Sequence, residues 1–132
     1  MKFFLDANIL FSASNTESNL FRLLQLLKAK ATVITSDYAH IEAQRNLDAK
    51  RPNWRNGLSE VLSGIEIVPS VDASVPAEIN DKDRPIVATA IKYHCNILLT
   101  GDKRDFGHLF GQAINRTKVL SPVMLNDALK KL

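Results

Sequence analysis

Four acidic residues lie where predicted buried segments of the chain begin or end. Asp6 directly follows the apolar run KFFL, and Asp102 follows the apolar run NILLT after a single glycine. Asp83 precedes one predicted helix, and Glu42 lies about two turns into another. Carboxylate oxygens are the ligands that Mg²⁺ and Mn²⁺ prefer, so these residue types indicate a site for a hard divalent cation.

Each acid also has a structural interpretation that involves no ligand. Asp6 and Asp102 suit turns at strand ends. Asp83 suits the N-cap of a helix with Pro85 in its first turn, and Glu42 suits a solvated helix face. The combination favours the metal site, because carboxylates gathered at a buried edge repel one another and are costly without a cation.

The elements that must position these acids alternate between strand and helix. Short runs rich in apolar and β-branched residues predict strands at 2–5, 31–35, 65–68, 96–100 and 117–121. Apolar residues at helical spacing, with Ser or Pro at several starts, predict helices at about 18–29, 36–49, 54–62, 84–94 and from 122 onward. Residues 69–80 predict a loop.

This alternation predicts an α/β fold, namely a three-layer α/β/α sandwich with a central parallel sheet of four to five strands. Right-handed crossovers place the carboxyl ends of parallel strands along one edge, and ligands bind there, where the strand order reverses. Asp6 and Asp102 are therefore expected at the same edge of the sheet, although they lie far apart in the sequence.

The composition predicts one globular domain that spans residues 1–132. The chain is 45% hydrophobic and 23% charged, which argues against disorder, and its net charge of +3 permits contact with phosphates without requiring it. The single cysteine, Cys95, has no partner for an internal disulfide and suits a small buried residue. No run approaches the roughly 18–20 apolar residues of a membrane span, so we expect a cytoplasmic protein without a membrane partner.

Four segments together resemble the acidic motifs of the PIN-domain ribonucleases, in particular the compact VapC-like toxins of toxin–antitoxin pairs. They are FLDANIL at 4–10, SDYAHIEAQRNL at 36–47, NDKDRPIVATA at 80–90 and LLTGDKRDF at 98–106. A single motif such as DxN or TGD occurs widely. Four of them in the family's order and spacing, each on the expected element, form a specific signal that covers nearly the whole chain.

The resemblance assigns roles to the four acids. It places the catalytic acids of the family at Asp6, Glu42, Asp83 and Asp102. Asp6, Asp83 and Asp102 are then the metal ligands for Mg²⁺ or Mn²⁺, with one or two ions bound. Glu42 binds through a water or orients the attacking one.

Four further residues are expected to support the acids. Asn8 matches the asparagine that commonly follows the first acid, and Thr100 matches the small hydroxyl residue before the fourth. Asp81 lies two residues before the third acid and is an alternative to it. Asp105 shares or takes over the role of the fourth acid.

The activity that the resemblance implies is metal-dependent endonucleolytic cleavage of RNA. It also implies a small antitoxin partner that occupies the acidic groove, and a homodimer. Several cations near the acids are candidates for holding the RNA backbone, although ordinary solvated charges would look the same. They are Arg45, Lys82, Arg84, Lys103 and Arg104.

Two other functions stay open. A PIN-like module that binds RNA or protein without cleaving it is the main alternative, although a complete set of acids disfavours it. A phosphotransfer domain of the receiver or hydrolase type also places aspartates at strand ends. Receivers usually show adjacent acids after the first strand and the hydrolases show DxD, whereas this chain has DAN.

Overall fold

The computed structural model describes residues 1–130, and within that part of the chain six strands form one sheet. The last two residues of the expected 1–132 domain lie outside the described part. The strand order is β3-β2-β1-β4-β6-β5, with bounds β1 Lys2–Leu5, β2 Thr32–Ser36, β3 Glu66–Val68, β4 Ile97–Leu99, β5 Ala113–Ile114 and β6 Thr117–Leu120. Neighbouring strands are parallel except at the edge, where β5 is antiparallel to β6. The predicted parallel sheet of four to five strands is therefore confirmed, with five parallel strands in the structure, and the two-residue β5 extends it.

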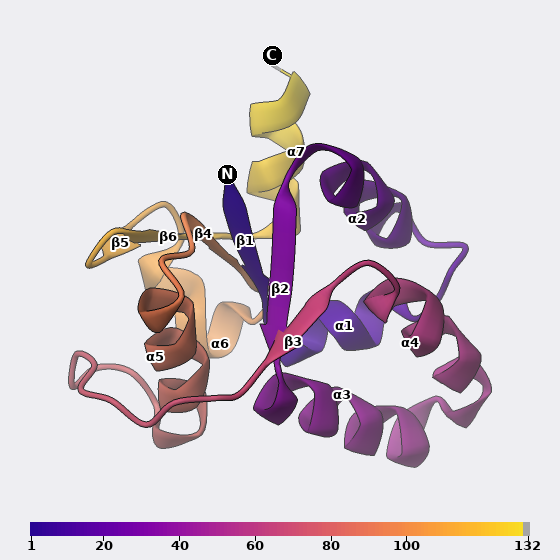
Figure 1. Ribbon diagram of the computed structural model, residues 1–132, viewed down its shortest axis with the longest axis horizontal. Coiled ribbons are helices and arrows are strands. Elements are labelled where there is room, and N and C mark those ends of the chain that lie inside the picture. The colour runs from indigo at the N-terminus through magenta and orange to yellow at the C-terminus, as the bar shows by residue number, and fades with distance from the viewer. Residues whose placement is uncertain (131–132) are drawn as a thin grey trace.

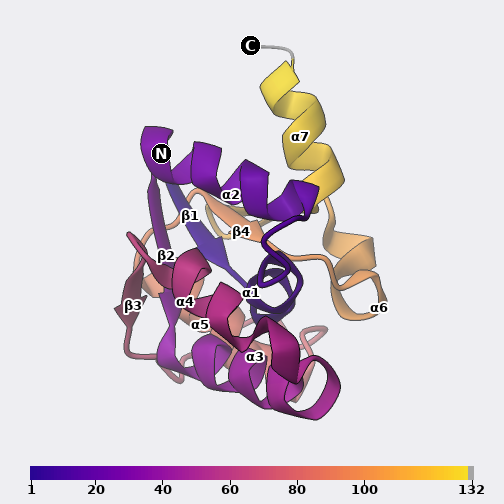
Figure 2. The same cartoon turned by 90° about the vertical axis from the view of Figure 1, so that its right-hand side faces the viewer.

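Helices cover both faces of the sheet, as expected for an α/β/α sandwich. Figure 1 shows α1 (Ala7–Ala13), α2 (Asn19–Lys30) and α4 (Arg55–Leu62) on one side of the strands, with α5 (Arg84–Lys92) and α6 (Lys103–Phe106) on the other. α3 (Asp37–Lys50) packs against α1 and α4 and passes below the end of β2. Figure 2 looks onto the first of these faces, and there α7 (Pro122–Lys130) projects away from the sheet. Short 3₁₀ helices lie at η1 Pro52–Trp54, η2 Asp81–Asp83 and η3 Gly107–Leu109.

Side-chain caps explain where several helices begin. Ser18 and Ser36 each accept a hydrogen bond of 3.1 Å from the backbone N–H of the third residue of the following helix, α2 and α3 respectively. The sequence did not predict α1, because DAN resembles a turn. The structure shows instead that the Asp6 side chain caps α1, accepting from the Ala7 N–H at 2.7 Å.

The end of α5 differs from the prediction by two residues. The helix ends at Lys92 because His94 adopts a left-handed conformation with φ of 57°. The N–H groups of His94 and Cys95 donate back to the carbonyls of Ile91 and Ala90, each at 3.0 Å, which is the Schellman pattern that terminates helices.

β1 and β4 lie side by side in the middle of the sheet, and the chain leaves them in opposite directions. After β1 the chain moves outward to β2 and β3, whereas after β4 it moves to β6 and β5. The Asp6 N–H donates to the Leu99 carbonyl at 3.1 Å, and the Thr100 N–H donates to the Leu120 carbonyl at 3.1 Å. The carboxyl ends of β1 and β4 therefore meet at the point where the strand order reverses, which is where open α/β sheets bind ligands.

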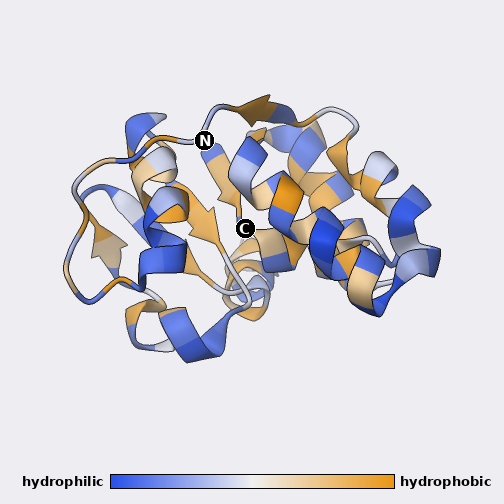
Figure 3. Cartoon of the chain, turned by 90° about the horizontal axis from the view of Figure 1, so that it is seen from below, coloured by the Kyte–Doolittle hydropathy of each residue, from blue (hydrophilic) through white to orange (hydrophobic). Residues whose placement is uncertain are grey.

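The interior of the sheet is apolar on both faces. Phe4, Ile34 and Leu98 are fully buried, as is typical of parallel strands covered by helices on either side. Figure 3 looks at the molecule from the edge that holds the strand carboxyl ends, and it shows hydrophobic strands surrounded by helices with hydrophilic outer faces. Cys95 is buried, as expected. Among the described helices, none has the length and apolar character needed to cross a membrane.

Candidate metal centre

The Asp6 carboxylate lies buried at the carboxyl end of β1, and it accepts hydrogen bonds from residues that follow β1 and from a residue that follows β4. Its Oδ1 accepts from the Ala7 N–H, and its Oδ2 accepts from the Thr100 hydroxyl at 2.8 Å and the Asn8 amide at 3.2 Å. Asn8 also donates to Thr100 Oγ1 at 3.1 Å and accepts from the Gly101 N–H at 2.8 Å. This network joins the end of β1 to the residues that follow β4, and it fixes the orientation of Asp6.

Burial and neighbouring charges make the ionised form of Asp6 costly. Burial raises the pKa of Asp6 to about 6. The hydrogen bonds from Thr100 and Ala7 oppose this rise, whereas the negative charges of Glu42 and Asp102 add to it. Glu42, half-buried on α3, is therefore near enough to Asp6 for their charges to interact.

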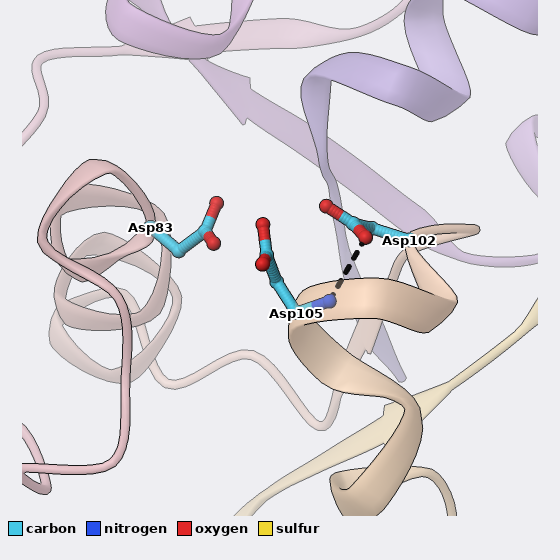
Figure 4. A group of neighbouring side chains, drawn as sticks. All are labelled: Asp83, Asp102 and Asp105. Carbon is cyan, nitrogen blue, oxygen red and sulfur yellow. Dashed lines mark hydrogen bonds between the residues drawn. The ribbon is translucent and has the colours of Figure 1, made fainter.

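Asp83, Asp102 and Asp105 form a group that we call the carboxylate cluster. One oxygen from each of the three side chains lies within 4.8 Å of the others. Figure 4 shows the three carboxylates pointing toward one another, Asp83 from the end of η2 and the other two from the start of α6. Asp102 caps α6 by accepting from the Asp105 N–H at 3.0 Å, so one short turn supplies two carboxylates.

Asp83 is the member of the carboxylate cluster with a buried oxygen that accepts no hydrogen bond from the described residues. Its side chain is buried, with the residue 6% exposed, and its Oδ2 has no hydrogen-bond partner among the described residues. Burial, followed by the charge of Asp6, raises the pKa of Asp83 to about 7, although the charge of Lys82 opposes this rise. A buried acceptor without a donor is rare in folded proteins and indicates an absent proton or ligand.

Asp105 has partners for both of its oxygens. Its Oδ1 accepts from the Asn80 amide at 2.7 Å, and its Oδ2 forms an ion pair with Lys82 Nζ at 3.1 Å. The hydrogen bond from Lys82 lowers the pKa of Asp105. The Tyr38 hydroxyl donates to the Lys82 carbonyl at 2.6 Å and so attaches η2 to α3.

Asn80 and Tyr38 have positions in this site that the sequence analysis did not predict. Asn80 opens the third motif and Tyr38 lies in the second, so both stood beside predicted acids. Neither residue type signals by itself that it bridges two segments of the chain.

The predicted acids occupy two neighbouring positions at this edge. Asp83 and Asp102 lie in the carboxylate cluster together with Asp105, which was expected as a supporting residue. Asp6 is not part of the 4.8 Å group and interacts with Asp83 and Asp102 through charge. Asp81 is exposed and lines a different pocket beside Ser70 and Asp72, so the structure does not bring it to the carboxylate cluster.

The predicted RNA-binding cations lie on the segments that carry the acids. Lys103 and Arg104 are exposed on α6, and Arg45 is exposed on α3, where it lines the same pocket as Glu42. Lys82 pairs with the carboxylate cluster, and Arg84 donates to a loop carbonyl at 3.3 Å. Two of the five cations are therefore engaged by the protein itself.

The donors at this edge suit a hard divalent cation. The carboxylate cluster offers oxygen ligands only, and Mg²⁺ and Mn²⁺ select such ligands. The unpartnered Asp83 Oδ2 would gain a partner from a bound cation, which would also screen the repulsion that raises its pKa. The residues present therefore fit the metal that the sequence resemblance implies.

The layers, the strand order and the acidic edge define the fold as the PIN-like α/β/α sandwich that the four motifs predicted. A chain of the crystal structure of VapBC2 from Rickettsia felis bound to a DNA fragment from their promoter shares it, with a TM-score of 0.66 over 92% of this chain and 98% of that chain. The two sequences are 20% identical, a likeness that shows the fold. No family model and no curated protein matches this sequence.

Proposed function

We propose that this chain is a divalent-metal-dependent ribonuclease, formed by one PIN-like domain over residues 1–132, that cleaves phosphodiester bonds within RNA. The observation that carries the proposal is the buried, unpartnered Oδ2 of Asp83 within a cluster of three carboxylates. The cluster lies where the strand order reverses, beside the carboxyl end of β1. A structural turn or cap would not require that several costly carboxylates converge there.

In this proposal Asp6, Asp83 and Asp102 hold Mg²⁺ or Mn²⁺, as the resemblance implies, and Asp105 contributes a further carboxylate oxygen. A bound ion supplies a water of lowered pKa and stabilises the charge that grows on the phosphate oxygens. Asn8 and Thr100 keep the Asp6 carboxylate aimed at this edge.

Glu42 has a separate role in the proposal. It faces the same edge from α3 and orients the attacking water, and its interaction with the charge of Asp6 supports that placement.

The surrounding cations make the acidic edge accessible to RNA. Lys103, Arg104 and Arg45 are exposed, so their charges can meet backbone phosphates without breaking a contact within the protein. Such contacts supply affinity without sequence specificity, and they weaken as salt is added.

We further propose that the protein is the toxin of a toxin–antitoxin pair. A structure that shares its fold is described as VapBC2 bound to a DNA fragment from the promoter, which supports a small antitoxin partner for this chain as well. The proposal includes the homodimer that the resemblance implies and the cytoplasmic location that the sequence analysis expects. Induced expression is expected to arrest growth, and co-expression of a small protein encoded beside the gene is expected to relieve the arrest.

The test is cleavage of single-stranded and structured RNA by the wild type and by Asp83→Asn, in Mg²⁺, in Mn²⁺ and in EDTA. Cleavage is expected only with metal, and Asp83→Asn is expected to reduce it by at least about 100-fold. Asp81→Asn is the matched control, because it makes the same change in charge two residues away at an exposed position.

Undiminished cleavage in EDTA or by Asp83→Asn would overturn the proposal. Binding of RNA without metal-dependent cleavage would support the non-cleaving PIN-like module instead.

A further inference from the structure

The positively charged side chain of Lys82 lies beside the carboxylates that are proposed to bind a metal ion, although metal binding itself needs no lysine there. Its Nζ lies 3.1 Å from Asp105 Oδ2, so a protein cation already sits against the carboxylate cluster. The Asp105 side chain is only 10% exposed, whereas the Lys82 side chain is 58% exposed. The ammonium therefore reaches the cluster from the solvent side. Its flexible aliphatic side chain can change rotamer and leave Asp105 at a small cost in free energy.

The charge balance of the cluster shows why this position matters. Among residues 1–130, Lys82 is the cation that forms an ion pair with the cluster, and the other ion pair, Arg55 with Asp48, lies elsewhere. Lys103, next to Asp102 in sequence, makes no ion pair with any described residue. One ammonium therefore compensates part of the repulsion among three carboxylates.

The contacts of Asp105 show what a divalent cation would have to displace. Lys82 engages Oδ2, and the Asn80 amide engages Oδ1. A cation bound jointly by Asp83, Asp102 and Asp105 would bind an oxygen of Asp105 and so lie close to both partners. A carboxylate oxygen has lone pairs for more than one partner, so the neutral amide can remain. Asn80 and Lys82 are both exposed, but the lysine is the partner that carries a positive charge, which a metal ion repels.

We propose that Lys82 is a built-in counter-ion of the carboxylate cluster, which a divalent cation displaces from Asp105 when it binds. Lys82 thereby sets the affinity of the site for metal. This inference rests on the metal site of the proposed function. A purely structural role, in which Lys82 clamps Asp105 in place, makes the opposite prediction, since loss of the clamp would then weaken metal binding.

Two lysine variants separate these roles. Lys82→Met keeps the aliphatic stem and the carbonyl that accepts from Tyr38, but it removes the ammonium. Lys103→Met removes the same charge from an exposed residue adjacent to Asp102, and so controls for the general loss of positive charge. The dissociation constant for Mn²⁺ is measured on the RNA-free protein from the electron paramagnetic resonance of free Mn²⁺.

Lys82→Met is expected to bind Mn²⁺ about 3- to 10-fold more tightly than the wild type, and Lys103→Met within about 2-fold of it, given the modest strength of an exposed ion pair. The thermal stability in EDTA is expected to change in the unfavourable direction. Without metal, Lys82→Met has no cation to offset the repulsion among the three carboxylates. Lys82→Met is then expected to have a lower Tm than both the wild type and Lys103→Met. Lys82→Gln provides a second variant and should agree with Lys82→Met in both measurements.

Unchanged or weaker Mn²⁺ binding by both Lys82 variants would overturn the counter-ion role while leaving the metal site intact. Absence of Mn²⁺ binding by the wild type would overturn the metal site itself, and the displacement with it. The Tm measurements in EDTA are independent of metal, and an unchanged Tm in the Lys82 variants would contradict the compensation that the ion pair provides.

Discussion

Replacing Asp83 with asparagine is expected to stabilise the metal-free protein at pH 8, although it removes a residue of the proposed metal site. The ionised Asp83 carboxylate is buried beside the charges of Asp6 and Asp105, and its Oδ2 has no partner among the described residues. An asparagine there carries no charge to desolvate, and its amide can donate to the neighbouring carboxylates.

The direction of the effect with pH follows from the raised pKa. Burial raises the pKa of Asp83 from 3.8 to about 7, so the folded protein binds this proton more tightly than the unfolded chain does. The free energy of unfolding therefore falls as the pH rises from about 4 to about 7, and the full cost is present above pH 7. The raised pKa of Asp6, about 6, adds a loss of the same sign over a lower range.

The size of the effect can be bounded from the same shift. A pKa of Asp83 that rises from 3.8 to about 7 on folding corresponds to about 4 kcal/mol. We expect about half of this, because neighbouring side chains rearrange when the charge is present. A gain of about 2 kcal/mol corresponds to roughly 8 °C in Tm for a domain of this size.

The assay is thermal unfolding in EDTA at pH 5 and pH 8. Asp83→Asn is expected to raise the Tm at pH 8, and to raise it by less than half as much at pH 5, where only part of the cost is present because the pH is about one unit above the unfolded pKa of 3.8. The exposed Asp81→Asn variant should change the Tm little at either pH. A decrease in the Tm of Asp83→Asn that is equal at both pH values would refute the reasoning, because it would show that the carboxyl stabilises the fold.

Three further changes test other parts of the account. Thr100→Val removes the hydroxyl that donates to buried Asp6 at 2.8 Å. Urea titration at pH 8 should show that the free energy of unfolding falls by about 2 kcal/mol, typical of a hydrogen bond to a charged group. A loss below about 0.5 kcal/mol would contradict this role. Tyr38→Phe removes the 2.6 Å hydrogen bond to the Lys82 carbonyl. It should weaken Mn²⁺ binding about 2- to 5-fold and lower the free energy of unfolding by at most about 1 kcal/mol. Unchanged Mn²⁺ affinity would show that this bond does not position η2. Gly57→Ala places a Cβ against the carbonyl oxygen of Ser14 at the end of α1, so the Tm should fall by an amount equivalent to about 1–3 kcal/mol or more. An unchanged Tm would contradict the close approach of α1 and α4.

The sequence predicted the strands and most helices because local signals were strong. Apolar runs marked the parallel strands, and the serine caps before α2 and α3 marked helix starts. α1 was missed because Asp6 serves at once as its cap and as a buried acid of the site, so the local pattern looked like a turn. β5 was missed because two residues carry too little pattern to indicate a strand.

The site was predictable in its residue types and less so in its contacts. The four motifs indicated which acids lie at the sheet edge, because strand ends fix where they arrive. The grouping of Asp105 with Asp83 depends on how η2 and α6 face each other, which no local spacing encodes. The same holds for the ion pair of Lys82 with Asp105, which joins two segments that the chain separates by a helix and a strand.

The most direct test of the account is the position of a bound metal ion. A crystal of the protein soaked in Mn²⁺ should show an anomalous difference peak bonded to carboxylate oxygens of Asp83 and Asp102, and the same soak of Asp83→Asn should show none there. Absence of that peak at Mn²⁺ concentrations that support RNA cleavage, or an equal peak in Asp83→Asn, would contradict the claim that these acids converge to hold a divalent cation.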